Sequence, residues 1–215
     1  MTKHGVIPDE WIVSYAAGAL SEGQALVIAS HAANHKGVRV KIDQAEDVGG
    51  TLIETENEAH LSENIFDGLL GRLDDEIDEI DIPDQQFPGM PAPLASYIGK
   101  PFEGLKWRFM GPGLRQHKLA EGPDGEKLWL LKAKGGVKIP VHDHRGSEMT
   151  LILTGSYHVG VKHYTSGLIE LAGVDDKNHE PMIDEGEDCI CLVVTEAPIK
   201  IHNLLGRIMQ PFTGL

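Results

Sequence analysis

The segment from Gly136 to Gly155 constrains the fold more than any other part of the 215-residue chain. It places His142 and His144 two residues apart, and side chains at positions i and i+2 of a strand point to the same side of a sheet. Glu148 follows a short turn and can approach the same point. If that side of the sheet faces the inside of a barrel, the two imidazoles and the carboxylate converge.

These residue types are ligands for one divalent metal ion. His179 adds a third imidazole from another part of the chain, so the predicted ligands are His142, His144, Glu148 and His179. Imidazole and carboxylate suit zinc, iron, manganese, nickel or copper, and geometry decides among them. The alternative interpretation is that His142 and His144 are surface histidines in a turn.

The rest of the C-terminal half alternates short apolar segments with glycine and proline turns. Many short strands at even spacing are typical of a sandwich or barrel. The strands are predicted at residues 106–110, 137–141, 149–153, 157–163, 169–171 and 189–195.

The N-terminal part has helical spacing of apolar residues instead. Helices are predicted over about 8–20, 21–35, 38–53 and 62–73, and Ser21 with Gln24 forms a capping-box pattern at the start of the second. Gly49 and Gly50 could break the third helix or allow a close helix contact.

A dense acidic run at 74–84 and a proline-rich stretch separate the two patterns. Clustered prolines end helices and stiffen a connection. We therefore predict an α+β protein of two domains, with about four helices in residues 1–85, a linker at 86–93 and a β-barrel in residues 94–215.

Charge is distributed unevenly between these parts. Residues 1–90 carry 18 Asp and Glu and 5 Lys and Arg, a net charge of −13, out of −14 for the whole chain. An acidic surface repels nucleic acid and attracts basic partners, although it can also serve only for solubility. There is no apolar run long enough to cross a bilayer and no signal-peptide pattern, so we expect a soluble cytoplasmic protein without membrane contact.

The segment 136–155 resembles the first motif of the cupin superfamily, G(x)5HxH(x)3–4E(x)6G, at every position. His179 lies where the second cupin motif supplies its histidine, but the Pro-x-Gly before it and the Asn after it are missing. The resemblance implies a jelly-roll type of β-barrel that holds one metal ion.

An acidic helical region before a cupin is similar to the ChrR-type anti-sigma factors. The segments that carry this resemblance follow the family's order: 14–22, 93–95 with 97–99, 189–192 and 210–212. The family implies zinc in the cupin, and the ligand types leave iron, manganese or nickel as alternatives. It also implies that the helices sequester an extracytoplasmic-function sigma factor and that the cupin releases it on oxidative stress of the singlet-oxygen type.

The chain departs from the family at the zinc motif of the helical domain, HxxxCxxC. His31 matches the first ligand, but His35 and Val38 replace the two cysteines. Structural zinc sites need four closed ligands. We therefore expect no zinc here, with weak binding by His31 and His35 together with His4 or His60 as the alternative.

Other functions stay open at this point. A cupin dioxygenase or isomerase could use the same four ligands, and a diverged sensor could bind a small ligand in the barrel. We predict a regulator with no catalytic residue, and Trp11, Ile12 and Tyr15 are candidate sigma contacts or core residues. Cys189 and Cys191 are interpreted as buried apolar residues, with redox sensing or a second metal site as the alternative. The sequence leaves the oligomeric state undetermined.

Overall fold

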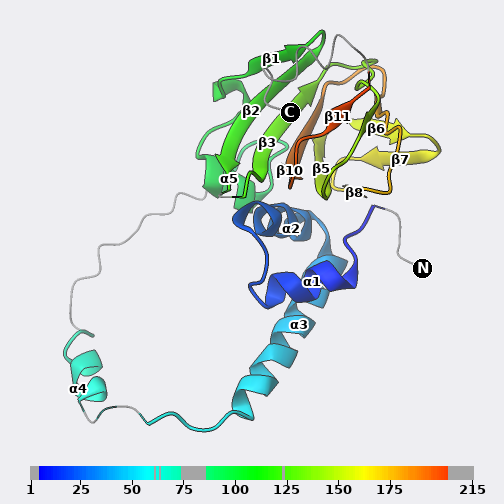
Figure 1. Cartoon of the computed structure of the whole chain (residues 1–215). Helices are drawn as coiled ribbons and strands as arrows, with labels where there is room; N and C mark the ends of the chain where they lie inside the picture. The colour runs from blue at the N-terminus through cyan, green and yellow to red at the C-terminus, as the bar shows by residue number, and fades with distance from the viewer. Residues whose placement is uncertain (1–4, 61, 63, 74–85, 123, 203–215) are drawn as a thin grey trace.

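The chain consists of a helical part followed by a β-barrel (Figure 1). A computed structural model describes residues 5–60, 62, 64–73, 86–122 and 124–202. The helices are α1 Asp9–Ala16, α2 Glu22–Asn34, α3 Lys36–Glu54, α4 Ile65–Leu70 and α5 Ala92–Ile98, and a 3-10 turn follows at Phe102–Gly104. The strands are β1 Arg108–Gly111, β2 Leu114–Glu121, β3 Lys127–Ala133, β4 His142–Asp143, β5 Glu148–Thr154, β6 Ser156–Val159, β7 Lys162–Thr165, β8 Ile169–Ala172, β9 Met182–Ile183, β10 Cys189–Thr195 and β11 Lys200–Ile201.

One large sheet dominates the barrel. It is antiparallel, with the strand order β1-β2-β3-β10-β5-β8. Two smaller sheets, β7-β6-β9 and β11-β4, form the opposite wall. The turn between β5 and β6 is Gly155, whose backbone φ of +69° favours glycine.

Both faces of the large sheet are buried at its central strand β10. Every residue of β10 is buried, because its side chains alternate between the barrel interior and the helices. Leu192 and Val194 belong to the core that the sheet shares with the helices, whereas Cys191 and Val193 belong to the core inside the barrel.

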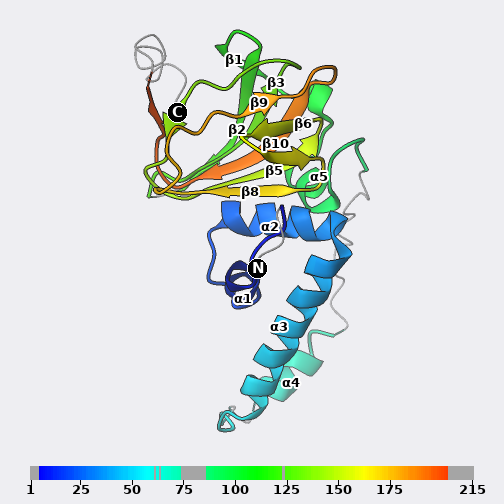
Figure 2. The same ribbon diagram turned by 90° about the vertical axis from the view of Figure 1, so that its right-hand side faces the viewer.

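Helix α2 lies across the outer face of the large sheet, as Figure 2 shows. Ser21 and Gln24 form the predicted capping box at its start. The Ser21 hydroxyl also donates to both oxygens of Glu126, each at 2.8 Å, next to β3. The helices and the barrel are therefore packed together, and the division into 1–85, 86–93 and 94–215 stays a prediction.

The predicted order of helices before a cupin-like barrel is confirmed, but several elements differ. Helix α3 continues through Gly49 and Gly50, and neither glycine makes a close contact. The predicted strand at 157–163 is a hairpin of β6 and β7. The segment 137–141 forms only one isolated bridge, at Lys138, while β2, β3 and α5 were not predicted. Among the described residues, no helix has the length and apolar character needed to cross a membrane.

Candidate metal centre

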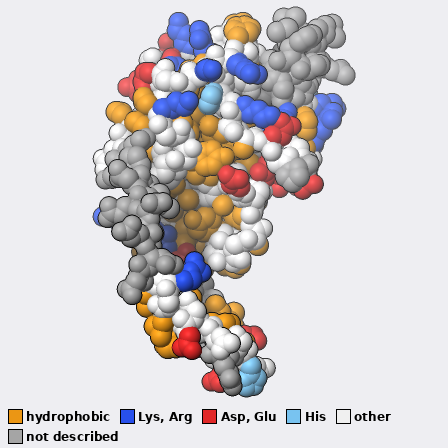
Figure 3. Space-filling model, turned by 90° about the vertical axis from the view of Figure 1, so that its left-hand side faces the viewer, with side chains coloured by type: hydrophobic (Ala, Val, Ile, Leu, Met, Phe, Trp, Pro, Cys, Tyr) orange, Lys and Arg blue, Asp and Glu red, His pale blue; other side chains and the backbone are white. Residues whose placement is uncertain are grey.

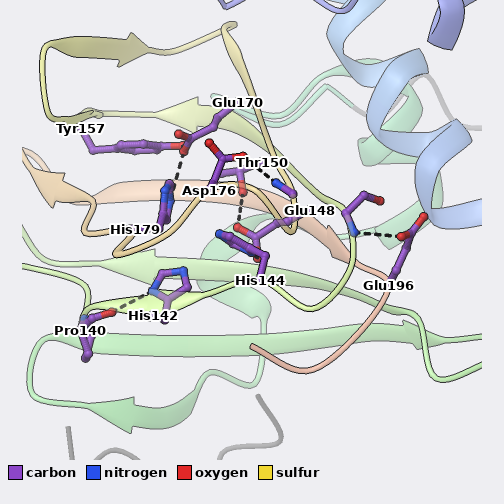
Figure 4. Close-up of polar contacts among 12 residues, drawn as sticks. Pro140, His142, His144, Glu148, Thr150, Tyr157, Glu170, Asp176, His179 and Glu196 are labelled. Carbon is purple, nitrogen blue, oxygen red and sulfur yellow. Dashed lines mark hydrogen bonds and ion pairs between the residues drawn. The ribbon is translucent and has the colours of Figure 1, made fainter. Parts of the chain in front are cut away.

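Three of the four predicted ligands meet inside the barrel. His142 lies on β4, His144 follows it, and His179 precedes β9; their ligand nitrogens lie within 4.8 Å of one another. The ring centroids are 4.9 Å, 5.0 Å and 5.0 Å apart. The backbones of His142 and His179 pair directly, with N to O distances of 3.1 Å and 2.9 Å. Figure 4 shows the three rings facing one another.

Hydrogen bonding selects the nitrogen that each ring can offer. His142 Nδ1 lies 2.8 Å from the Pro140 carbonyl and donates to it, which leaves the lone pair on Nε2 for a metal ion. His144 Nε2 is buried and has no hydrogen-bond partner among the described residues. Buried polar atoms are normally paired, so this atom fits a metal ligand.

Burial also keeps the three imidazoles neutral. Burial, followed by the neighbouring histidines, lowers the pKa of His144 to about 4 and that of His179 to about 3. The pKa of His142 is lowered mainly by the same desolvation. Only a neutral imidazole has a lone pair for a metal ion, so the site is ready for one at neutral pH.

Glu148 lies at the edge of this cluster. Its Oε2 is 3.9 Å from His144 Nδ1, and its Oε1 accepts a hydrogen bond of 3.2 Å from Thr150. Burial, followed by the charge of Glu170, raises the pKa of Glu148 to about 8. The tight cluster of ligand atoms contains only the histidines, so the role of Glu148 as a fourth ligand stays a prediction.

A second carboxylate, Glu170 on β8, was not predicted. Its Oε2 lies 3.6 Å from His179 Nε2 and accepts a hydrogen bond of 2.6 Å from the Tyr157 hydroxyl. Burial raises the pKa of Glu170. Glu170 belongs to no motif, and the only signal in the sequence is a charged residue within an otherwise apolar strand.

His142 and His179 line a cavity of about 400 Å³ inside the barrel. Most of its wall is apolar, and Trp129, Leu131 and Val193 contribute to it. Cys191 also lines it, but its thiol is buried and lies 3.6 Å from that of Cys189. Both cysteines are free and belong to the barrel core, as predicted.

The helical histidines have other partners. His31 is fully buried, and its Nδ1 lies 3.0 Å from the Gly167 carbonyl, while His35 Nδ1 accepts a hydrogen bond from the Val38 amide. In the part of the chain that is described, only the barrel histidines bring three ligand atoms together. His4 lies outside the described residues, so the expected lack of zinc here stays a prediction.

Comparison with known proteins identifies the family. The model of the ChrR cupin-like domain matches residues 98–198. Anti-sigma-E factor ChrR of Cereibacter sphaeroides (strain ATCC 17023) is 37% identical over 213 residues, which cover 99% of each chain. The crystal structure of Rhodobacter sphaeroides SigE in complex with the anti-sigma ChrR matches 90% of this chain and 98% of that chain, with 36% identity and a TM-score of 0.79. The similarity extends over both the helices and the barrel and is to a regulator rather than an enzyme. The chain belongs to the ChrR family of anti-sigma factors.

Proposed function

We propose that this protein binds an extracytoplasmic-function sigma factor in the cytoplasm, keeps it from core RNA polymerase and releases it under oxidative stress of the singlet-oxygen type. The ChrR structure of the comparison is a complex with SigE. A metal ion in the barrel, held by His142, His144, Glu148 and His179, belongs to the same proposal. Zinc suits this set best, because it accepts four nitrogen and oxygen ligands.

The observation that carries the proposal is an apolar helix face without a partner among the described residues. The stripe on α3 begins at Val38 and Ile42, which are fully buried. The same side of the helix continues into Val48 and Leu52, which are each 62% exposed, and Ile53, which is 75% exposed. Figure 2 shows this half of α3 extending away from the body of the molecule.

Helix α4, which Figure 1 shows apart from α3, carries a second set of exposed apolar side chains. Apolar side chains in and next to this short helix are exposed: Ile65, Phe66, Leu69, Leu70 and Leu73. Figure 3 shows hydrophobic side chains on the helical region that extends below the barrel. Monomeric proteins rarely expose so many large apolar residues together, and such surfaces are typical of protein interfaces.

The earlier candidates for sigma contacts are part of the helical core instead. Ile12 is 2% exposed, and Trp11 and Tyr15 pack against the buried cluster. Of the exposed apolar residues in this region, those on the second half of α3 and on α4 are therefore the proposed contacts.

A route from the metal to the helices supports the proposed release. Only one layer of β-sheet separates the barrel interior from α2, and β10 contacts both. The side-chain amide of Gln24 on α2 donates a hydrogen bond of 3.3 Å to the Glu196 carboxylate. The same carboxylate accepts a hydrogen bond of 2.9 Å from the backbone N–H of Ser147. Ser147 immediately precedes Glu148, so a shift of the metal ligands would reach α2.

Co-purification with the sigma factor encoded beside this protein tests the proposal. We expect the full chain to form a stable complex and Leu52→Asp with Ile53→Asp to weaken it by at least about tenfold, since two apolar contacts become charged. The matched control is Val40→Asp, which makes the same apolar-to-charged change at a 53% exposed position on the other side of α3. No complex with the unaltered full chain would overturn the proposal.

A further inference from the structure

The cavity inside the barrel has an ordered change of polarity along its length. The register of β3, β10 and β5 divides its wall into successive rows. The first row is polar and contains Lys127, Thr195 and Glu148. The second contains Trp129, Val193 and Thr150. The third contains Leu131 and Cys191, with Gln116 of β2 beside them. One end of the cavity therefore suits a polar group and the other suits an apolar one.

The polar end coincides with the histidine cluster. Glu148 of the first row lies beside His144, and Thr150 of the second row pairs across strands with Glu170, which lies beside His179. Ala133 follows in the next row, and Ile139 and Ile183 add further apolar side chains to the cavity wall. Ligand pockets in proteins have this composition, with mostly apolar walls and a few convergent polar groups, and volumes of roughly 300–1,000 Å³.

Charge at the polar end distinguishes between possible head groups. The cationic residues in the first two rows are Lys118 and Lys127, and the carboxyl groups there belong to Glu121, Glu148 and Glu170, whereas Arg108 lies beside the third row. Lys118 and Glu121 pair with each other. Even with all three carboxyl groups ionised, the added charge of a divalent ion on the histidines makes this end of the cavity positive, and burial, which raises the pKa of Glu148 and of Glu170, makes it more so. An anionic head group fits that charge.

We propose that the barrel binds a small amphipathic carboxylate, with its carboxylate at the histidine end and its hydrocarbon tail along Trp129, Leu131 and Val193. The inference rests on the proposed metal ion for the preference for an anion. It does not depend on sigma binding, because the cavity is complete within one chain. Ligand binding would give the cupin domain a second input besides the metal.

Isothermal titration of the metal-loaded full chain with octanoate tests this inference, with octanol and glucose as comparisons. We expect octanoate to bind, octanol to bind at least about tenfold more weakly, and glucose not to bind. Metal content measured on the same sample separates the two proposals. A sample that does not retain the metal contradicts the proposed metal site. A sample that retains the metal but does not bind octanoate overturns the proposed ligand site.

Two variants locate the ligand. Val193→Phe and Leu131→Trp each fill the cavity, and each is expected to weaken octanoate binding at least about tenfold. Val161→Phe is the matched control, because Val161 is fully exposed in the β6–β7 turn. Circular dichroism identifies a variant that fails to fold, in which case the other variant decides. Unchanged affinity in a folded filled variant, or equal binding of octanol and octanoate, overturns the proposal.

Discussion

At the scale of single residues, His144 offers a direct test of the metal centre. Its Nε2 is buried without a hydrogen-bond partner in the described structure, so a metal ion is the natural partner of this atom. We expect His144→Ala to lose the stoichiometric metal that the unaltered chain retains, as measured by elemental analysis after dialysis. The control His163→Ala removes an imidazole from β7, outside the cluster, and should leave the metal content unchanged.

His31 gives the folded chain a dependence on pH. Burial lowers the pKa of His31 from 6.5 to about 4. The unfolded chain therefore binds this proton at a higher pH than the folded chain does. The contribution of neutral His31 to stability is complete above about pH 6.5 and decreases as the pH falls toward 4.

The unaltered chain should lose unfolding free energy between about pH 7 and about pH 5. We expect this loss to be about 2 kcal/mol smaller in His31→Leu. Chemical denaturation at the two pH values measures the difference. His60→Leu replaces an exposed histidine and should keep the dependence of the unaltered chain. A variant His31→Leu with the same pH dependence as the unaltered chain would show that this burial has no effect on stability.

The site was predictable only where a motif fixes the spacing. His142 and His144 were identified because side chains at positions i and i+2 of a strand point to the same side of the sheet. His179 was identified because it lies where the second cupin motif supplies its histidine. Glu170 could not be identified in this way. Its position depends on the pairing of β8 with β5, which joins residues that are far apart in the sequence.

At the scale of elements, the backbone at Gly155 explains why the first cupin motif ends in glycine. It joins β5 to β6 with a φ of +69°, and a Cβ atom there would lie 2.9 Å from both the Asp188 carbonyl oxygen and Cys189 Cα. Gly160, in the β6–β7 turn, has a φ of +57° but open space around it.

We expect Gly160→Ala to cost only the left-handed strain of about 1–2 kcal/mol, and Gly155→Ala to cost more because the backbone must also move. Thermal unfolding of the two variants measures the comparison. Equal destabilisation would mean that the contact with the strand at Cys189 has no role.

Elements were predicted well where local signals are complete. The capping box of Ser21 and Gln24 marked the start of α2, and helix α3 tolerates Gly49 and Gly50 because its other residues sustain the helix. The hairpin of β6 and β7 was read as one strand because the turn between them has no proline or Asn-Gly signal, only Gly160.

At the scale of the whole molecule, the two parts could be predicted but their packing could not. The strand CICLVVT is apolar at nearly every position, which is typical of a strand buried on both faces. That pattern could have indicated a second covering layer, but it does not show that α2 provides it. The identity of the covering helix depends on contacts such as His31 with Gly167.

The charge of the chain predicts how the sigma complex forms. Residues 1–90 have a net charge of −13, and a protein that binds DNA presents basic surfaces to the phosphates. Salt screens attraction between exposed charges over distances of about 10 Å at 0.1 M, so the association rate should fall roughly tenfold between about 50 mM and about 500 mM salt. Apolar contacts from α3 and α4 are not screened in this way, so the dissociation rate should change much less. Stopped-flow association with the purified sigma factor measures both rates. An association rate independent of salt would mean that the acidic residues do not steer the encounter and serve only for solubility.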